Sequence, residues 1–529
     1  MPHVIMTQVF DLSIDKMLDS FSIQQKISVL NKDEILPLLE KLFDGLSDEQ
    51  EMICVDELEI DLGIFREDEL SRRFITEKIL SMITAQVQDK IRTGLYQSDA
   101  GIRKEPRMLN IFRQWIFYMQ KGYLPWNASR PDESWYQQVL EAGATDHQSI
   151  ELLQELLTDN PEVVERIVFL HSPAYLSHII ELLTAEKQEG LLLLPDELEK
   201  VTRYISKGYA NNETVQRIRI AQSIWKAILR MAAVWSRPAG LSSFSITRQL
   251  IADNFTELQI LRVAASGTLL AQLTLSAAAW QELAHSYGKT VSDPSHHGKL
   301  GDTGPGNGDI KILTLKENYP VSNKTEQIES LRDIIQGDVI LPDGFPAKSD
   351  IAREHLKNQI TEEGIFTRQA GLVILHPFLY PFMKNMALVK DGNFINLAAQ
   401  QQALQLLHYM TTGDNRWDEH TLLMAKILCD YPFQEPVNSA VVPLADHFAG
   451  ADELLRAVIE QWEALKNPSI AALQESFLQR EGKLVSKNDT YHLQVERTGI
   501  DILLDRLPWS INYVKLPWMK KILSVEWTK

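Results

Sequence analysis

Apolar residues recur at helical spacing along most of the chain and alternate with polar residues only in a few short stretches. His3–Leu12 and Met52–Leu62 alternate, which predicts two strands, and between them the apolar positions of residues 21–43 recur every three or four residues. The same helical spacing follows from Phe65 to about Thr93. Strand, helix pair and strand predict a small α+β unit over residues 1–95.

The pattern is helical throughout from Ile102 to about Trp235, and we predict a helical domain over residues 102–285. Prolines interrupt it at several points, as expected between helices rather than inside them. One amphipathic stripe is ended by Gly122; it runs through Leu109, Phe112, Trp115, Ile116 and Met119. No repeat of fixed period holds over three copies, so the pattern does not predict a solenoid.

Composition changes between about Ser286 and Asp350, where Ser, Pro, Gly, His and Asp cluster. Such composition is typical of a linker, and we predict a flexible linker over residues 286–350 with one short helix at Thr325–Gln336. A domain boundary therefore belongs here.

Apolar and aromatic side chains are densest after the linker, in Gly371–Lys529, which holds 5 of the 11 Trp. Helical stretches are expected at Leu397–Met410, from Trp417 to Cys429, at Asp452–Leu465 and at Ile470–Gln479. Strand-like phrases follow at Tyr491–Glu496, Gly499–Leu504, Ile511–Lys515 and Ile522–Trp527. The predicted fold class is mainly α, with small α+β units at both ends: a multi-domain helical body, a flexible linker, and a helical domain over residues 365–529 that finishes in a small sheet.

Composition excludes several classes of protein. The formal charge is −18, from 53 basic and 71 acidic residues, and argues against a general nucleic-acid-binding surface. No run of about 18 apolar residues and no signal-peptide pattern occurs, so we expect neither a membrane span nor secretion by a signal peptide. Two cysteines far apart in sequence, Cys54 and Cys429, predict no disulfide framework and favour a reducing compartment.

Five groups of residues could carry chemistry, and each has a simpler interpretation. The carboxylates of Asp56, Glu57, Glu59 and Asp61 could bind metal, but their alternation favours the solvated face of a strand. Gly288-Lys289-Thr290, Asp302-Thr303-Gly304 and the pair His296 and His297 lack the rest of a phosphate loop, a protease triplet or a zinc site. His376, His408, His420, Asp418 and Glu419 have no nucleophile phrase beside them. We therefore predict no catalytic residue, no metal site, no cofactor and no enzymatic activity.

The last 22 residues differ from the acidic remainder, because Lys515, Lys520, Lys521 and Lys529 against Glu526 leave a net charge of +3. Such a segment is either a solvated rim or a surface for an acidic partner, and the sequence favours the rim.

Several unusual phrases recur in order at the two ends of the chain. They are Val55-Asp56-Glu57-Leu58-Glu59-Ile60-Asp61-Leu62-Gly63, Gly122-Tyr123-Leu124-Pro125-Trp126, Gly371 to Leu379, Leu422 to Cys429, Trp462 to Asn467, Phe477 to Leu484, Asp501 to Trp509, Lys515 to Met519 and Val525-Glu526-Trp527. Over about residues 1–130 and 365–529 the chain thus resembles the tape measure proteins of extracellular contractile injection systems, the phage-tail-like particles of the antifeeding prophage and Photorhabdus virulence cassette type.

The resemblance implies a structural assembly protein that acts as a ruler, sets tube and sheath length, and contacts the baseplate or spike. It implies tail tube, baseplate, spike and tube-terminator proteins as partners, several copies per particle, and a location first in the bacterial cytoplasm and then inside the particle. The residues that it marks for interaction or core packing are Leu58, Asp61, Gly63, Pro125, Trp126, His376, Pro377, Phe378, Trp462, Pro508, Trp509, Pro517, Trp518 and Trp527. The alternative is a compact baseplate adaptor or chaperone that sets no length. We expect Trp509, Trp518 and Trp527 to be mainly packing residues.

Overall fold

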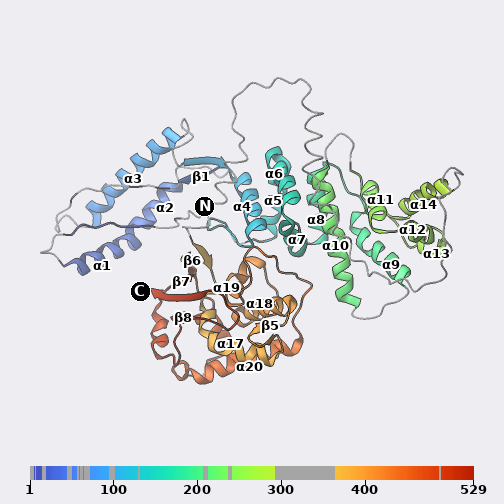
Figure 1. Cartoon of the computed structure of the whole chain (residues 1–529). Helices are drawn as coiled ribbons and strands as arrows, with labels where there is room; N and C mark the ends of the chain where they lie inside the picture. Colours follow the sequence, from blue (N-terminus) through green and yellow to red (C-terminus); the bar gives the residue numbers. More distant parts are fainter. Residues whose placement is uncertain are drawn as a thin grey trace. The chain divides into compact units, whose positions relative to one another are not determined.

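The computed structural model (Figure 1) describes residues 5, 8–14, 19–44, 51–55, 57, 59, 64, 72–94, 102–128, 131–206, 213–235, 241–291, 364–466, 468–487 and 490–528. The chain divides into two compact units. The N-terminal unit comprises Met1–Ile116 and Pro125–Ser149, and the C-terminal unit comprises Phe117–Leu124 and Ile150–Lys529.

The N-terminal unit begins with a helix that changes its winding midway. Asp19 caps α1 (Ser20–Leu30), which continues through a π-helical segment, η1 (Asn31–Ile35), into α2 (Leu36–Asp44). The polar break predicted between two helices is therefore a π-helical turn. Helix α3 (Arg72–Gly94) contacts both α2 and η1. Apolar side chains buried in these helices include Ile35, Leu39, Ile79 and Ile83.

A two-stranded antiparallel ladder joins β1 (Glu51–Val55) to β2 (Ile102–Pro106). The helix predicted from Ile102 is wrong in its first five residues, because backbone pairing with β1 overrides the helical pattern there. The strand predicted at His3–Leu12 is also not found, since Ile5 and residues 8–12 have no regular structure and its other residues lie outside the described ranges. Helices α4 (Arg107–Lys121), α5 (Glu133–Thr145) and α6 (His147–Asp159) follow.

Helices continue in the C-terminal unit, where α10 (Glu213–Val234) contacts four others. These are α7 (Pro161–Leu170), α8 (Pro173–Thr184), α9 (Leu194–Ser206) and α11 (Ser243–Asn254). Pro161 and Pro173, which interrupt the helical pattern, occupy the first turns of α7 and α8, where a missing N–H costs nothing. The short 3-10 segment η3 (Leu191–Leu193) directly precedes α9.

Three further helices complete this part: α12 (Glu257–Ala264), α13 (Gly267–Leu270) and α14 (Ala277–Val291). A capping box of Thr256 and Gln259 begins α12. Helix α14 continues past Ser286, so the predicted linker cannot begin there. The rest of the predicted linker, with the helix expected at Thr325–Gln336, lies outside the described residues.

A five-stranded sheet has the order β3-β6-β7-β9-β8, and only the β7–β9 pair is parallel. Its strands are β3 (Ile365–Thr367), β6 (Gly482–Lys487), β7 (Thr490–Glu496), β8 (Tyr513–Val514) and β9 (Ile522–Thr528). The predicted strand Gly499–Leu504 is wrong. A capping box of Thr498 and Asp501 starts a 3-10 helix there, η8 (Gly499–Arg506). Strands β3 and β6 were not predicted.

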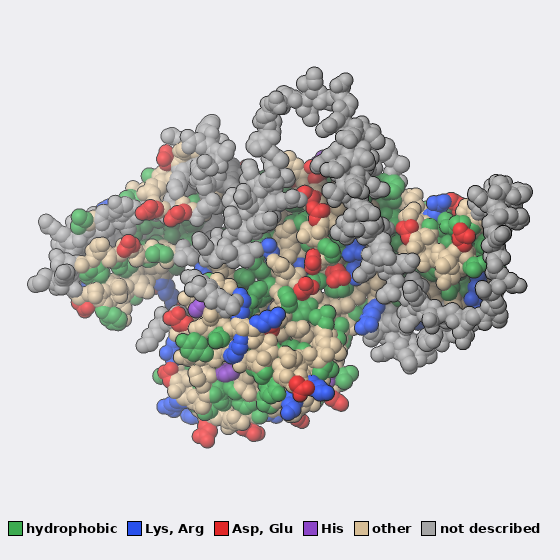
Figure 2. Space-filling view, in the orientation of Figure 1, with side chains coloured by type: hydrophobic (Ala, Val, Ile, Leu, Met, Phe, Trp, Pro, Cys, Tyr) green, Lys and Arg blue, Asp and Glu red, His purple; other side chains and the backbone are tan. Residues whose placement is uncertain are grey.

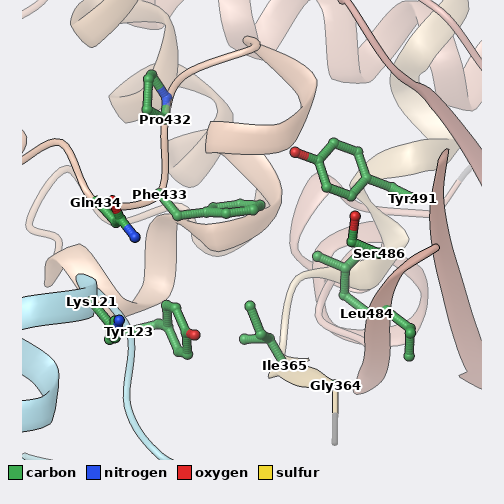
Figure 3. Close-up of a pocket in the computed structure, with 11 residues that line it drawn as sticks. Lys121, Tyr123, Gly364, Ile365, Pro432, Phe433, Gln434, Leu484, Ser486 and Tyr491 are labelled. Carbon is green, nitrogen blue, oxygen red and sulfur yellow. The ribbon is translucent and has the colours of Figure 1, made fainter. Parts of the chain in front are cut away.

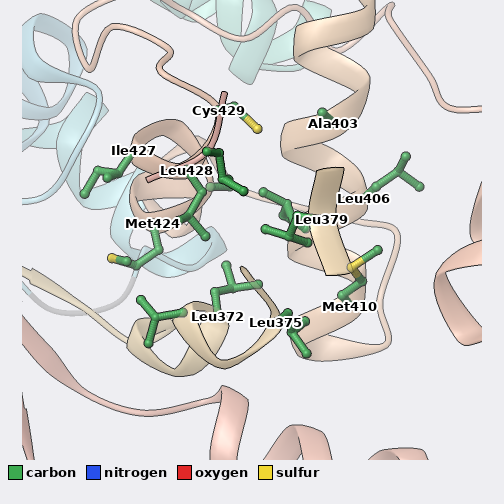
Figure 4. Packing of buried hydrophobic residues seen from close by; sticks show 14 of the residues in the cluster. Leu372, Leu375, Leu379, Ala403, Leu406, Met410, Met424, Ile427, Leu428 and Cys429 are labelled. Carbon is green, nitrogen blue, oxygen red and sulfur yellow. The ribbon is translucent and has the colours of Figure 1, made fainter. Parts of the chain in front are cut away.

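Residues of this sheet and of several helices form one apolar core, and Figure 4 shows some of its buried side chains. The helices are η4 (Ala370–Leu375), α17 (His376–Asn385), α18 (Leu397–Thr412), η5 (Glu419–Leu422), α19 (Leu423–Leu428), α20 (Ala445–Gln461), η6 (Glu463–Leu465), α21 (Ile470–Leu473) and η7 (Gln474–Leu478). A small hairpin, β4 (Val389–Lys390) and β5 (Asn393–Phe394), precedes α18. The predicted fold class, mainly α with a small C-terminal sheet, is confirmed.

Acidic, basic and apolar side chains are interspersed on the described surface that faces the viewer in Figure 2. This distribution agrees with the net charge of −18, which disfavours a continuous basic surface.

Candidate functional site

Three charged side chains are buried together in the C-terminal unit. Glu419 on η5 accepts hydrogen bonds from Arg166 on α7, with the guanidinium Nε 3.2 Å from both carboxylate oxygens. The ammonium of Lys426 on α19 lies 2.6 Å from Oε1 of the same carboxylate. Arg166 and Glu419 have 0% of their surface exposed and Lys426 has 1%. We call these three residues the buried ion cluster.

The single carboxylate cannot accept hydrogen bonds from all the N–H groups of the two cations. Backbone carbonyls accept the others. Arg166 also donates to the carbonyl oxygens of Met119 and Gln434. Lys426 donates to the carbonyls of Phe433 and Glu435 at 3.0 and 2.9 Å. Burial lowers the pKa of Lys426, and the charge of Glu419 opposes that change. The cluster therefore joins the end of α4, helix α7 and the loop at residues 433–435.

Gly122 lets the chain pass directly over the buried ion cluster. Its φ is +76°, a left-handed conformation that favours glycine. A Cβ at this position would lie 2.7 Å from the Phe433 carbonyl oxygen and 2.8 Å from Oε1 of Glu419. The phrase Gly122-Tyr123-Leu124-Pro125-Trp126 thus begins with a residue that both conformation and space require to be glycine.

Three tryptophans of residues 364–528, which we call the C-terminal block, donate their indole N–H groups to backbone carbonyls distant in sequence. Trp509 donates to Ile374 at 2.9 Å, Trp518 to Leu428 at 2.7 Å and Trp462 to Leu503 at 3.2 Å. Each indole thereby packs its apolar ring and satisfies its polar N–H. The two Leu-Pro-Trp phrases consequently attach the chain after η8 to two different helical segments, η4 and the end of α19.

The remaining marked residues lie in several places. His376 and Phe378 are half-buried on α17, where Phe378 contacts Trp509 edge-on with ring centroids 5.0 Å apart. Half-buried Trp527 lies 5.1 Å from the guanidinium of Arg480. Exposed positions are Pro377, Pro508, Pro517 and Trp126, while Pro125 is half-buried. Leu58, Asp61 and Gly63 lie outside the described residues.

The residues considered for acid–base chemistry serve separate contacts. Glu419 belongs to the buried ion cluster, and His376 Nδ1 is 3.0 Å from the Val373 carbonyl. His408 lies between Gln369 and the Arg416 carbonyl, and the ring of His420 packs edge-on against Tyr118. Burial raises the pKa of the Cys429 thiol, which disfavours the thiolate. Within the described ranges, no three His, Cys, Asp or Glu side chains could together hold a metal ion.

A pocket of about 270 Å³ lies beside the buried ion cluster (Figure 3). Loop residues Pro432, Phe433 and Gln434 line one part of it, and Lys121, at the end of α4, and Tyr123, just after it, line another. The sheet contributes the remaining side, through Gly364, Ile365, Leu484, Val485, Ser486 and Tyr491. The carbonyls of Phe433 and Gln434 are held by the cluster, so the cluster shapes the pocket wall.

Arg166 and Lys426 were not singled out in the sequence. A signal for both is present, since each is a charged residue inside an apolar run, Val163-Val164-Glu165-Arg166-Ile167-Val168 and Leu422 to Cys429. A cation within such a run is buried only when it is paired. The sequence does not reveal the partner.

In this arrangement, buried charges join segments of the chain that are distant in sequence. The chain belongs to the family of contractile injection system tape measure proteins, whose model matches residues 2–527. No curated protein and no solved structure matches the chain. Within the residues that the structure describes, no helix is long and apolar enough to cross a bilayer.

Proposed function

We propose that the protein occupies the tail tube of a contractile injection particle during assembly and sets the number of tube and sheath rings. The observation that carries this proposal is the family match over residues 2–527, which includes both ends and the middle of the chain. In this proposal the partners are tube, baseplate, spike and tube-terminator proteins. Assembly begins in the bacterial cytoplasm, and the protein acts without enzymatic activity.

The C-terminal block is the better candidate for the end that holds the baseplate or spike. Its Trp509, Trp518 and Trp462 hydrogen-bond to carbonyls of separate segments and so join these segments into one core. The buried ion cluster extends this core to α7, more than 250 residues earlier in the chain. An anchor of this kind suits a ruler that must keep hold of one end while rings are added.

Particle length tests the proposal directly. We would insert 40 residues of helical sequence between residues 292 and 350, which leaves the packed helices up to α14 and the C-terminal core unchanged. A ruler should lengthen the particle by about 60 Å if the insert is helical and by up to about 130–145 Å if it is extended. Electron microscopy measures the shift, and its size gives the rise per residue of the working conformation.

A matched variant carries the same 40 residues after Lys529, where they add mass without separating the two ends. It should leave particle length unchanged. Normal particles of unaltered length with the internal insert would contradict the ruler. That result would instead favour the compact baseplate adaptor or chaperone.

A further inference from the structure

The C-terminal block has an apolar core of its own. Every described side chain of this core lies between Ala370 and Trp527, so none of the described residues of α4 to α14 belongs to it. Within the described part of the chain, the extensive contacts between helices and strands likewise lie either inside the C-terminal block or among the elements before it. The core of the block is therefore complete without the earlier helices.

Polar contacts join the C-terminal block to residues 117–124, α7 and α10, which we call the helical side. Besides the buried ion cluster, the amide of His420 donates to the Tyr118 hydroxyl at 3.2 Å. Gln222 on α10 donates to the side chain of Asn438 at 3.1 Å. A polar group that loses such a partner can bind water instead, whereas exposed apolar surface has no such compensation.

Packing between the two sides is incomplete. The pocket of about 270 Å³ lies where they meet, lined by Lys121 and Tyr123 of the helical side and by Phe433 and Tyr491 of the C-terminal block, among others (Figure 3). Protein interiors contain few voids larger than a water molecule. This part of the boundary therefore gains less from dispersion contacts than the interior of either side.

The buried ion cluster divides between the two sides without leaving an unpaired charge inside either. Glu419 and Lys426 both belong to the C-terminal block, where Lys426 also donates to two carbonyls of the loop at residues 433–435. Arg166 belongs to the helical side and keeps its bond to the Met119 carbonyl there. Within the cluster, parting of the two sides breaks the bonds from Arg166 to Glu419 and to the loop.

Charge balance favours this division. The assembled cluster holds two cations and one anion, so one positive charge is buried in excess. Parting brings the Arg166 guanidinium into water and leaves Glu419 and Lys426 as a one-to-one pair. Hydration of separated charges offsets much of their lost attraction, and for this reason a buried ion pair often stabilises a fold less than apolar packing of similar volume.

We propose that the C-terminal block parts from the helical side as an intact folded body, with the buried ion cluster as the joint. Helix α14 ends at Val291 and β3 begins at Ile365, so the chain from one side to the other runs through the residues between them. Such an opening exposes less apolar surface than unfolding of either side and is therefore reached at lower free energy. That it lets the two ends of a ruler move apart rests on the proposed function, whereas the opening itself does not.

The first test uses two glycines with the same backbone conformation. Gly122 and Gly190 both have a φ of +76°. A Cβ at Gly122 would lie 2.8 Å from the Glu419 carboxylate, whereas one at Gly190 would lie 3.4 Å from the nearest atom, in the Leu275 side chain. Gly122→Ala should therefore open the joint, while Gly190→Ala strains the backbone equally without touching the joint.

Hydrogen exchange of the full chain, followed by mass spectrometry, compares the segment around His420, whose amide donates across the joint, with β7 and β9. In Gly122→Ala we expect exchange at His420 to be at least about tenfold faster, with β7 and β9 unchanged. Gly190→Ala should leave exchange at His420 within about twofold of the parent chain. Unchanged exchange at His420 in Gly122→Ala, an equal increase in Gly190→Ala, or equally faster exchange in β7 and β9 overturns the proposal.

Two charge variants test how the cluster divides. Arg166→Gln leaves the pair of Glu419 and Lys426 intact, so exchange should become at least about tenfold faster at His420 and stay unchanged in β7 and β9. Glu419→Gln leaves Lys426 without its anion inside the block, so β7 and β9 should exchange faster as well. Equal acceleration of β7 and β9 by the two variants contradicts the division.

Separation itself is measured by single-molecule energy transfer between dyes on Arg219→Cys in α10 and Lys384→Cys in α17, both exposed positions. Cys54 is replaced by Ser, and Cys429 is buried and does not react. Parting gives a population of lower transfer efficiency, whose share should rise at least about tenfold in the two variants that open the joint. A single population of unchanged efficiency in both variants overturns the proposal. Particle length is not measured in these assays, so their failure is distinct from failure of the ruler.

Discussion

Two groups of buried charges among the described residues of the C-terminal unit, the buried ion cluster and the pair of Arg480 with Asp501, differ in how far apart their members lie in the sequence. Arg166 and Glu419 are 253 residues apart, and both are completely buried. Arg480 and Asp501 are 21 residues apart, and 9% of the Arg480 side chain is exposed. The first cluster can form only when distant parts of the fold have assembled, whereas the second joins residues on either side of the β6–β7 hairpin.

The two groups also differ in how their charges are balanced. The Arg480 guanidinium binds both oxygens of Asp501, at 2.5 and 2.8 Å, and the Thr498 amide donates to the same carboxylate at 2.7 Å. Burial acts to raise the pKa of Asp501, but these bonds outweigh it and lower the pKa. One cation thus balances one anion. In the buried ion cluster two cations share one anion, and loss of that anion leaves both uncompensated.

The largest expected effect is that of Glu419→Gln. It should lower the free energy of unfolding by about 3–5 kcal/mol, because two cations remain buried without their carboxylate. Chemical denaturation of the full chain measures the change. Glu435→Gln is the comparison: its side chain is exposed and its charge only weakly supports that of Lys426, while its carbonyl is kept, so it should lower the free energy of unfolding by less than about 1 kcal/mol. Equal effects of the two substitutions would contradict the claim that the Glu419 carboxylate stabilises the fold by pairing with Arg166 and Lys426.

A smaller effect is expected for Asp501→Asn, about 1–3 kcal/mol. The asparagine oxygen can still accept from the Thr498 amide, so the start of η8 persists and mainly the bond with Arg480 is lost. Asp505→Asn breaks an exposed pair with Arg497 and should cost less than about 1 kcal/mol. If Asp501→Asn destabilised the protein as much as Glu419→Gln, sequence separation would not distinguish the clusters.

The smallest effect concerns His408, a buried polar group that needs no ionic partner. Its Nε2 lies 3.1 Å from the Arg416 carbonyl and its Nδ1 lies 2.9 Å from Gln369 Nε2. Burial lowers its pKa below 6.5, so the unfolded chain binds a proton first as the pH falls. Its contribution to stability is present above pH 6.5 and is lost as the pH falls below that value. His408→Gln should therefore flatten the decline in unfolding free energy between pH 7 and 5; an unchanged slope would contradict this role.

Local signals in the sequence predicted the helices well. Helix α18 begins after the Asn396 cap and ends at Gly413, which has a φ of +74°, and both its position and the inward His408 follow from the apolar spacing. One strand prediction failed for a local reason. At Gly499–Leu504 the cap formed by Thr498 and Asp501 prevails over alternation. Strand β6 was not predicted, and its pairing with β3 joins residues far apart in the sequence.

The sequence by itself determined where most helices begin and end, that the chain is mainly helical, and that its two ends resemble a tape measure family, because capping, proline placement and apolar spacing act over a few residues. The tertiary structure alone decided that Arg166 meets Glu419, that Gly122 must be glycine beside them, and which carbonyls Trp509 and Trp518 bind. These contacts join residues more than 40 positions apart. The spacing of residues along the chain does not predict these contacts, because the two partners come close together only when the chain folds.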